Sequence, residues 1–88
     1  NNENIPITYS GFTIGKKRRE VDYCIGDNTN ISRNHAKFVV RDGVTYIVDN
    51  RSTNGTFVNN STVRPGDEIA LNDGDMIMLA DEKFEFKK

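Results

Sequence analysis

The chain has 88 residues, of which 35% are hydrophobic and 28% are charged, and its formal net charge at pH 7 is −1. This length predicts one domain with a modest core, and the hydrophobic content excludes a wholly disordered chain. The slightly acidic charge argues against general nucleic-acid binding, because proteins with that function are usually basic.

The single cysteine and the lack of long apolar runs set the expected cellular context. Cys24 cannot form an intrachain disulfide, and a small domain without disulfides fits a reducing compartment, so we expect a cytoplasmic location. No apolar run approaches the ~20 residues that span a bilayer. We therefore expect no direct membrane insertion, although the parent protein could be membrane-associated. From the polar ends of the chain we expect residues 1–88 to be a single domain excised from a larger protein.

The first third of the chain predicts short strands separated by polar loops. The expected strands cover residues 5–9, 11–15 and 21–25, and the expected loops cover residues 16–20 and 26–30. Pro6 restricts the first strand to a sheet edge or a strand start, because proline cannot donate a backbone hydrogen bond. In the second strand Phe12 and Ile14 alternate with Thr13, which is typical of a half-buried strand.

The middle of the chain carries the clearest hairpin pattern. Residues 36–41 alternate, with Ala36, Phe38 and Val40 on one face. The dipeptide Asp42-Gly43 is a strong hairpin signal, because both residues accept positive φ. The strand after this turn is expected to present Val44, Tyr46 and Val48 on one face.

The last third of the chain continues the same pattern of short strands. The expected strands cover residues 56–59, 68–71, 75–80 and 83–87, with loops at 49–55 and 60–66 and a tight turn at 72–74. No long window shows the 3.6-residue period of a helix, and turn signals recur about every 8–12 residues. The sequence therefore predicts an all-β sandwich or barrel.

The apolar positions of these strands define the expected core. Its members are Phe12, Ile14, Phe38, Val40, Val48, Phe57, Ile69, Leu71, Ile77, Leu79, Phe84 and Phe86, with Cys24 as a small core residue. Each side chain that is fully buried stabilises the fold by about 1.5–3 kcal/mol. Such a core holds the strand ends still, so that short loops present polar groups in fixed positions.

Two loops rich in hydroxyl and amide groups are the candidate binding residues. One is Ser32–His35 and the other is Ser52–Thr56, and each precedes an expected strand. Loops at one end of a sandwich converge, so these groups could meet the cations of Lys16 and Arg33. Hydroxyl and amide donors with one or two cations suit a phosphate, which offers three acceptor oxygens. On composition alone the same residues also fit ordinary turns.

The order of several motifs resembles a forkhead-associated (FHA) domain. The motifs are Gly15-Lys16, Val21–Tyr23, Ile31–Ala36, Asp49, Ser52–Asn59 and Leu71–Asp75. The match runs over residues 12–86. It implies a β-sandwich of two twisted, mainly antiparallel sheets, with about eleven short strands and the ligand loops at one end. It also implies a phosphopeptide-binding module that prefers phosphothreonine, needs no cofactor and depends on a partner Ser/Thr protein kinase.

The resemblance also implies roles for individual residues. Ser32 would bind the phosphate, Thr53 would reach the phosphate or the phosphothreonine, and Arg33 would line the phosphopeptide. Asn54 would hold the peptide backbone through both atoms of its amide, and Asn30 would read side chains that follow the phosphothreonine. The residues expected to support the site are Gly15, His35, Gly55 and Asn59, with His35 bracing the loops.

Lys16 departs from the family pattern, which typically has arginine after this glycine. Arginine forms a planar fork that matches two phosphate oxygens, whereas lysine acts as a point charge. Lys17 and Arg18 are therefore the candidates for a secondary or specificity contact. We expect weaker or less selective phosphate binding than an arginine version would give.

Other functions fit the sequence less well. The basic run Lys16–Arg19 could follow a nucleic-acid backbone, but acidic residues follow it closely and the chain is acidic overall. Ser32, His35 and Asp49 could suggest a catalytic triad, but no nucleophile-elbow pattern surrounds them, so no catalytic residue is assigned. One cysteine and one histidine do not predict a structural zinc site. The remaining alternative is a phosphate-independent interaction module on the same fold.

Overall fold

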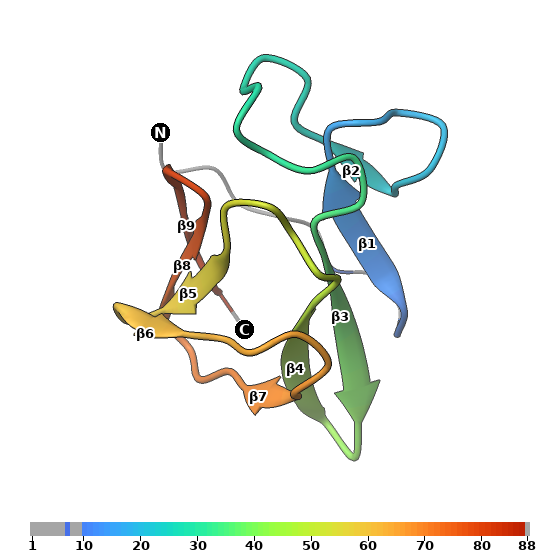
Figure 1. Cartoon of the computed structure of the whole chain (residues 1–88). Helices are drawn as coiled ribbons and strands as arrows, with labels where there is room; N and C mark the ends of the chain where they lie inside the picture. Colours follow the sequence, from blue (N-terminus) through green and yellow to red (C-terminus); the bar gives the residue numbers. More distant parts are fainter. Residues whose placement is uncertain (1–6, 8–9, 88) are drawn as a thin grey trace.

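The computed structural model describes residues 7 and 10–87, which form nine short strands and no helix (Figure 1). The strands are β1 Phe12–Gly15, β2 Tyr23–Cys24, β3 Ala36–Arg41, β4 Val44–Asp49, β5 Thr56–Val58, β6 Ser61–Thr62, β7 Ile69–Ala70, β8 Met76–Leu79 and β9 Glu82–Glu85. The strand expected at residues 5–9 lies outside the described residues, apart from Ile7. The described residues include no helix that is long and apolar enough to cross a membrane.

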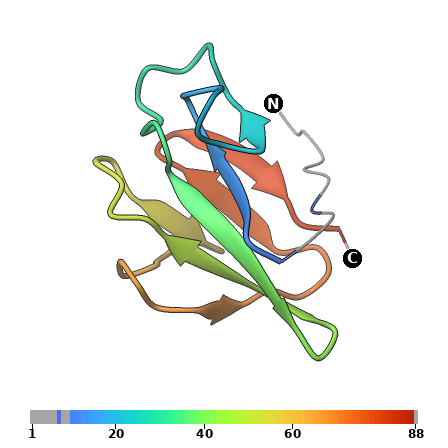
Figure 2. The same ribbon diagram turned by 90° about the vertical axis from the view of Figure 1, so that its right-hand side faces the viewer.

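The strands form two sheets that pack face to face as a sandwich (Figure 2). One sheet has the order β2-β1-β3-β4-β7 and the other has the order β6-β5-β8-β9. Only β1 and β2 pair in parallel, and the other named strand pairs are antiparallel. The predicted all-β sandwich of mainly antiparallel sheets is therefore confirmed, with nine of the roughly eleven expected strands in the described part.

The hairpin between β3 and β4 forms at the predicted dipeptide. Asp42 has φ of 52° and Gly43 has φ of 78°, so both turn residues occupy the left-handed region that a two-residue hairpin loop requires. The resulting register pairs Phe38 with Ile47 and Lys37 with Val48. It places Lys37 and Val48 side by side on the outer face of the sheet.

The core differs from the prediction in which residues of β4 and β5 face inward. Ile47 is fully buried in the core, whereas Val48 is buried outside the core cluster, on the opposite face of β4. Thr56 and Val58 point inward from β5, so Phe57 is only half-buried, against the prediction. The expected face of both strands was wrong by one residue, and a shift of one residue exchanges the two faces of a strand.

Most other expected core positions are buried. Phe12, Ile14, Phe38, Leu71, Ile77, Leu79, Phe84 and Phe86 belong to the core cluster, whereas Val40 and Ile69 are half-buried. Ile25, Ile31 and Val63 join the core from outside the strands. Ile25 is the last residue of the strand expected at 21–25, whereas Ile31 and Val63 lie in no expected strand. Cys24 is half-buried on the edge strand β2, where its thiol lies 3.3 Å from the Lys16 carbonyl, so its assignment to the core was wrong.

Candidate functional site

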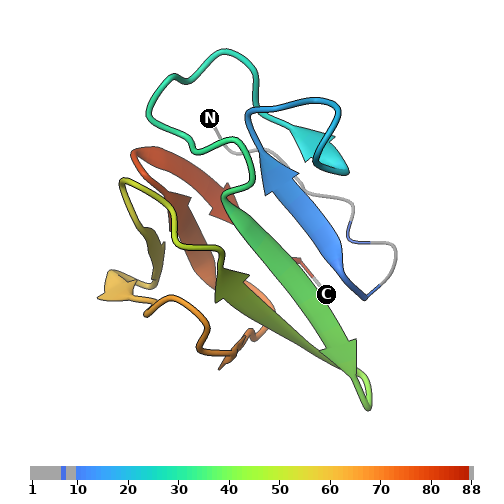
Figure 3. The same cartoon turned by 45° about the vertical axis from the view of Figure 1, so that its right-hand side comes forward.

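Three loops come together at one end of the sandwich (Figure 3). A cleft lies among them. They connect β1 to β2, β2 to β3 and β4 to β5, and their cleft, here called the loop cleft, has a volume of about 510 Å³. Its lining residues are Lys16, Glu20, Thr29, Asn30, Ile31, Ser32, Arg33, Asn34, Asn50, Arg51, Thr53 and Asn54. The structure thus brings together Lys16, Asn30, Ser32, Arg33, Thr53 and Asn54, all of which were candidate site residues.

Gly15 allows the first loop to lie directly against the second. A Cβ atom at this position would stand 2.1 Å from the Arg33 carbonyl oxygen, so no larger residue fits without moving backbone. The close approach lets the Lys16 amide donate to the Ser32 carbonyl at 3.0 Å and the Lys17 amide donate to the Arg33 carbonyl at 3.1 Å. The backbone of Lys16, from which its side chain extends, is thereby held beside Ser32.

Ser32 and Asn54 connect the second loop to the third. The Ser32 hydroxyl oxygen accepts a hydrogen bond from the Thr53 amide at 2.9 Å, which leaves its own hydrogen available for a ligand. The Asn54 side-chain amide donates to the Asn30 carbonyl at 2.8 Å, and its carbonyl oxygen remains available as an acceptor. A ligand would therefore meet donors that are already held in place.

His35 lies fully buried beneath both loops and bonds to each of them. Its Nδ1 accepts from the Ser32 amide at 3.0 Å, so the ring hydrogen is on Nε2, which donates to the Gly55 carbonyl at 2.8 Å. Burial lowers the pKa of this imidazole below its ordinary value of 6.5, despite the opposing effects of Gly55 and Asp49. Because Nδ1 contacts the Ser32 backbone and not its hydroxyl, the two residues are not arranged as a nucleophile and its base.

Asp49 holds the third loop in place through hydrogen bonds from its buried side. The sequence analysis did not assign this role to it. Its carboxylate is 3% exposed and accepts hydrogen bonds from the Ser52 hydroxyl at 2.5 Å, the Ser52 amide at 3.1 Å and the Thr56 hydroxyl at 2.6 Å. The Ser52 hydroxyl oxygen also accepts from the Gly55 amide at 3.1 Å. The sequence signals of this arrangement were the place of Asp49 among the motif residues and the serine and threonine that follow it by three and seven residues.

The cations are distributed differently from the prediction. Lys16 and Arg33 line the loop cleft, and so does Arg51, which the sequence analysis missed although it directly precedes Ser52. Lys17 and Arg18 are not among the lining residues, and Lys17 lies 3.9 Å from the Glu20 carboxylate. The loop cleft thus has three basic lining residues and one acidic one, which favours an anionic ligand.

The remaining support residues lie at the two ends of β5. Gly55, at the start, has φ of +92°, and an added Cβ would come within 3.0 Å of the Phe57 ring. Asn59, at the other end, lies outside the loop cleft, and its side chain bonds to Asp75 and to the Met76 amide. Asn59 therefore stabilises the connection to β8, whereas Gly55 belongs to the third loop.

The arrangement provides binding groups for an anion. It combines hydroxyl and backbone donors with three basic side chains, and phosphate oxygens accept from such groups. Among the described residues, no group of three or more His, Cys, Asp or Glu side chains could hold a metal ion.

Comparisons with known proteins agree with this architecture. The family model of the FHA domain matches residues 12–80. The transcriptional regulatory protein EmbR of Mycobacterium tuberculosis is 40% identical over 62 residues, which cover 69% of this chain and 15% of that protein. Smad nuclear-interacting protein 1 of Mus musculus is 31% identical over 103 residues, which cover 98% of this chain and 27% of that protein. The chain thus spans only a small part of these relatives.

Solved structures show the same fold. M. tuberculosis EmbR in complex with a low affinity phosphopeptide superposes with a TM-score of 0.79 at 35% identity, over 89% of this chain and 20% of that chain. The N-terminal FHA domain of Rad53p from S. cerevisiae, in complex with a phosphothreonine peptide, gives a TM-score of 0.68 at 31% identity, over 75% of this chain and 52% of that chain.

Proposed function

The chain belongs to the FHA domain family, and we propose that it binds phosphothreonine in a partner protein or elsewhere in its parent chain, without catalysing a reaction. The observation that carries this proposal is the Ser32–Thr53 hydrogen bond of 2.9 Å, because it holds two hydroxyl residues together among three basic residues. The phosphopeptide complexes of EmbR and Rad53p add support from relatives.

In this proposal the residues of the loop cleft contact different parts of the phosphopeptide. Ser32, Thr53 and Lys16 bind the phosphate, and Arg33 lines the peptide. The free oxygen of Asn54 accepts from the peptide backbone. Because the Asn30 side chain is directed to Asp81 at 3.3 Å, its contact with the residues after the phosphothreonine would come from the surface that this pair forms.

Such binding would place the domain downstream of a Ser/Thr protein kinase. A single phosphate changes the charge of a threonine by about −1.5 to −2, so the interaction would depend on phosphorylation and be reversible. We propose a cytoplasmic setting for this switch, in a protein longer than the domain.

A calorimetric titration tests the proposal. A degenerate phosphothreonine peptide library should bind, and the same library with unphosphorylated threonine should not. Ser32→Ala should weaken binding at least about tenfold, because it removes a charge-assisted hydrogen bond. Ser61→Ala, on exposed β6, is the matched control and should bind as the natural chain does.

Lys16 separates this function from the second candidate, a phosphate-independent interaction module on the same fold. The observation that favours the second candidate is the lysine in place of the family's usual arginine. Under the first proposal Lys16→Arg keeps or tightens binding and Lys16→Ala weakens it. If phosphatase treatment of a natural partner leaves its binding intact, the phosphate-independent module is the correct function.

A further inference from the structure

A second hollow lies beside the loop cleft, on the outer face of the five-stranded sheet. This hollow has a volume of about 400 Å³. It shares Asn50 and Arg51 with the loop cleft, and we call it the Lys37 hollow because Lys37 is one of its further lining residues. The others are Val48, Asp49, Gly66 and Glu68. Lys37 and Val48 are cross-strand partners on β3 and β4, which gives the hollow a rigid floor.

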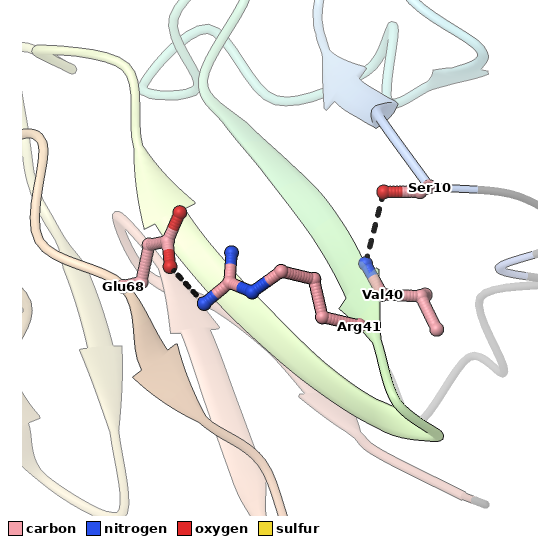
Figure 4. A network of polar contacts seen from close by, with 4 residues as sticks. All are labelled: Ser10, Val40, Arg41 and Glu68. Atoms are coloured by element: carbon pink, nitrogen blue, oxygen red, sulfur yellow. Dashed lines mark hydrogen bonds and ion pairs between the residues drawn. The ribbon is translucent and has the colours of Figure 1, made fainter.

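The acidic groups of the Lys37 hollow are already occupied by other partners. Glu68 accepts a hydrogen bond from the Arg41 guanidinium at 2.6 Å (Figure 4), and Arg41 also lies 4.6 Å from the centre of the Tyr46 ring. This bond, with the charges of Arg41 and Lys37, holds the pKa of Glu68 below its ordinary value. The Asp49 carboxylate is buried and bound by Ser52 and Thr56.

The basic groups of the hollow are less engaged. Among the described residues, the ion pairs are Lys17–Glu20, Arg41–Glu68 and Lys87–Glu85, so neither Lys37 nor Arg51 forms one. Lys37 is half-buried and Arg51 is exposed at the boundary between the two hollows. A segment leaving the loop cleft over Arg51 would therefore meet positive charge next to the apolar side chain of Val48.

We propose that the Lys37 hollow binds an acidic side chain, Asp or Glu, of the same segment whose phosphothreonine occupies the loop cleft. This inference rests on the proposed function and adds a sequence preference to it. A carboxylate suits the hollow better than a second phosphate, because Glu68 would repel a group of nearly two negative charges. Val48 precedes Arg51 by three residues, so at most about 10 Å of chain separates these two positions. The acidic residue is therefore expected about three to five residues from the phosphothreonine.

A peptide scan with the 88-residue chain tests the inference. One phosphothreonine peptide has neutral flanks, and its relatives carry a single glutamate two to six residues away on either side. Further peptides replace that glutamate by phosphoserine or the phosphothreonine by threonine. Exposed charge pairs change binding constants by up to about fivefold. We expect glutamate at one or two adjacent positions on one side to tighten binding about three- to fivefold.

Variants assign that preference to the hollow. Lys37→Gln should remove the preference for glutamate and leave the affinity for the neutral phosphopeptide unchanged. Lys83→Gln makes the same charge change at an exposed position of β9, in the other sheet, and should keep both the glutamate preference and the affinity for the neutral phosphopeptide. Arg51→Gln should reduce both the glutamate preference and the affinity for the neutral phosphopeptide, since Arg51 lines both hollows. Thermal unfolding of each variant shows that the fold is retained.

The outcomes separate this inference from the function on which it rests. If all phosphothreonine peptides bind equally, or if Lys37→Gln keeps the glutamate preference, the inference is wrong and the proposed function stands. A stronger preference for phosphoserine than for glutamate would also overturn the inference. If no phosphothreonine peptide binds, or if glutamate peptides bind equally well without the phosphate, both are overturned.

Discussion

Gly15 is the residue at which the site is most sensitive to a single added carbon. Gly15→Ala would place Cβ 2.1 Å from the Arg33 carbonyl oxygen and 2.7 Å from its carbon, both of which are backbone atoms. The first loop must then move away from Ser32 and Arg33. Overpacking of this kind costs typically about 1–3 kcal/mol. We expect urea denaturation to show a loss of that size and titration to show weaker phosphopeptide binding.

A second glycine provides the control for this substitution. A Cβ at Gly26 would meet only the Cys24 sulfur, at an ordinary distance of 3.8 Å. Gly26→Ala should therefore change the free energy of unfolding by less than about 1 kcal/mol, and binding should be unaffected. Equal effects of the two substitutions would contradict the role given to Gly15.

His35 makes the stability of the domain depend on pH below neutrality. The folded state keeps the imidazole neutral, since Nδ1 accepts from the Ser32 amide, and its pKa lies below the ordinary 6.5. The unfolded chain therefore takes up the proton first. The contribution of the neutral imidazole to the free energy of unfolding is fully present above about pH 6.5. It is lost progressively as the pH falls from there toward the folded-state pKa.

The measurement is the free energy of unfolding in urea at pH 7.5, 6.5 and 5.5. The chain has only one histidine, and carboxylates titrate mainly near pH 4, so a decrease in this window would belong to His35. His35→Gln should lower stability at pH 7.5 but remove most of this decrease. An unchanged pH dependence in that variant would show that another group is responsible.

At the scale of elements, the third loop depends on its buried carboxylate. Asp49→Asn would replace one acceptor oxygen by an NH₂ group that faces hydroxyl and amide donors. A buried group left without a partner costs about 1–3 kcal/mol. We expect Asp49→Asn to lower the free energy of unfolding by that amount and to weaken phosphopeptide binding, because the same loop presents Thr53 and Asn54.

Asp67→Asn removes the same charge at an exposed position and is the appropriate control. It should change stability by less than about 0.5 kcal/mol, as surface substitutions usually do. Both variants can be compared by urea denaturation at pH 7. If Asp49→Asn were equally mild, the loop would be held by its backbone contacts alone.

The elements that could be predicted from the sequence are those with a local cause. The β3–β4 hairpin follows from Asp42-Gly43, and the inward face of β8 follows from Ile77 and Leu79. The inward face of β5 could not be predicted in the same way. There a polar residue, Thr56, points inward because Asp49 accepts its hydrogen bond across the loop, and that contact is not visible in the alternation of apolar residues.

The candidate site shows the same division between local and non-local causes. Motif resemblance selected Ser32, Thr53 and Asn54, all of which line the loop cleft. It did not select Arg51, whose position depends on a loop with positive φ of 56° at that residue. Lys17 and Arg18, the candidates for a secondary contact, are not among the lining residues. Sequence proximity to a motif does not determine the direction of a side chain in a loop.

At the scale of the whole molecule, the two halves of the chain carry opposite charge. Eight of the twelve Lys and Arg residues lie within residues 10–51, against five of the thirteen Asp and Glu residues. These eight are Lys16, Lys17, Arg18, Arg19, Arg33, Lys37, Arg41 and Arg51. This segment contains β1 to β4, which belong to one sheet, and most of the residues that line the loop cleft, and we call it the basic side. Its excess of basic residues favours an anionic ligand although the net charge of the chain is −1.

This charge separation predicts that salt affects binding much more than stability. The basic side groups lie near the surface, where their attraction for a phosphopeptide is screened as the Debye length falls from about 10 Å at 0.1 M salt to about 3 Å at 1 M. The ion pairs within the described part of the fold are exposed, and such pairs contribute about 0–1 kcal/mol each.

We therefore expect the dissociation constant for a phosphothreonine peptide to rise several-fold between 0.05 and 0.5 M NaCl. The urea midpoint should change little over the same range. A dissociation constant that does not respond to salt would mean that the basic side does not attract the ligand, and the binding surface would then have to lie elsewhere on the sandwich.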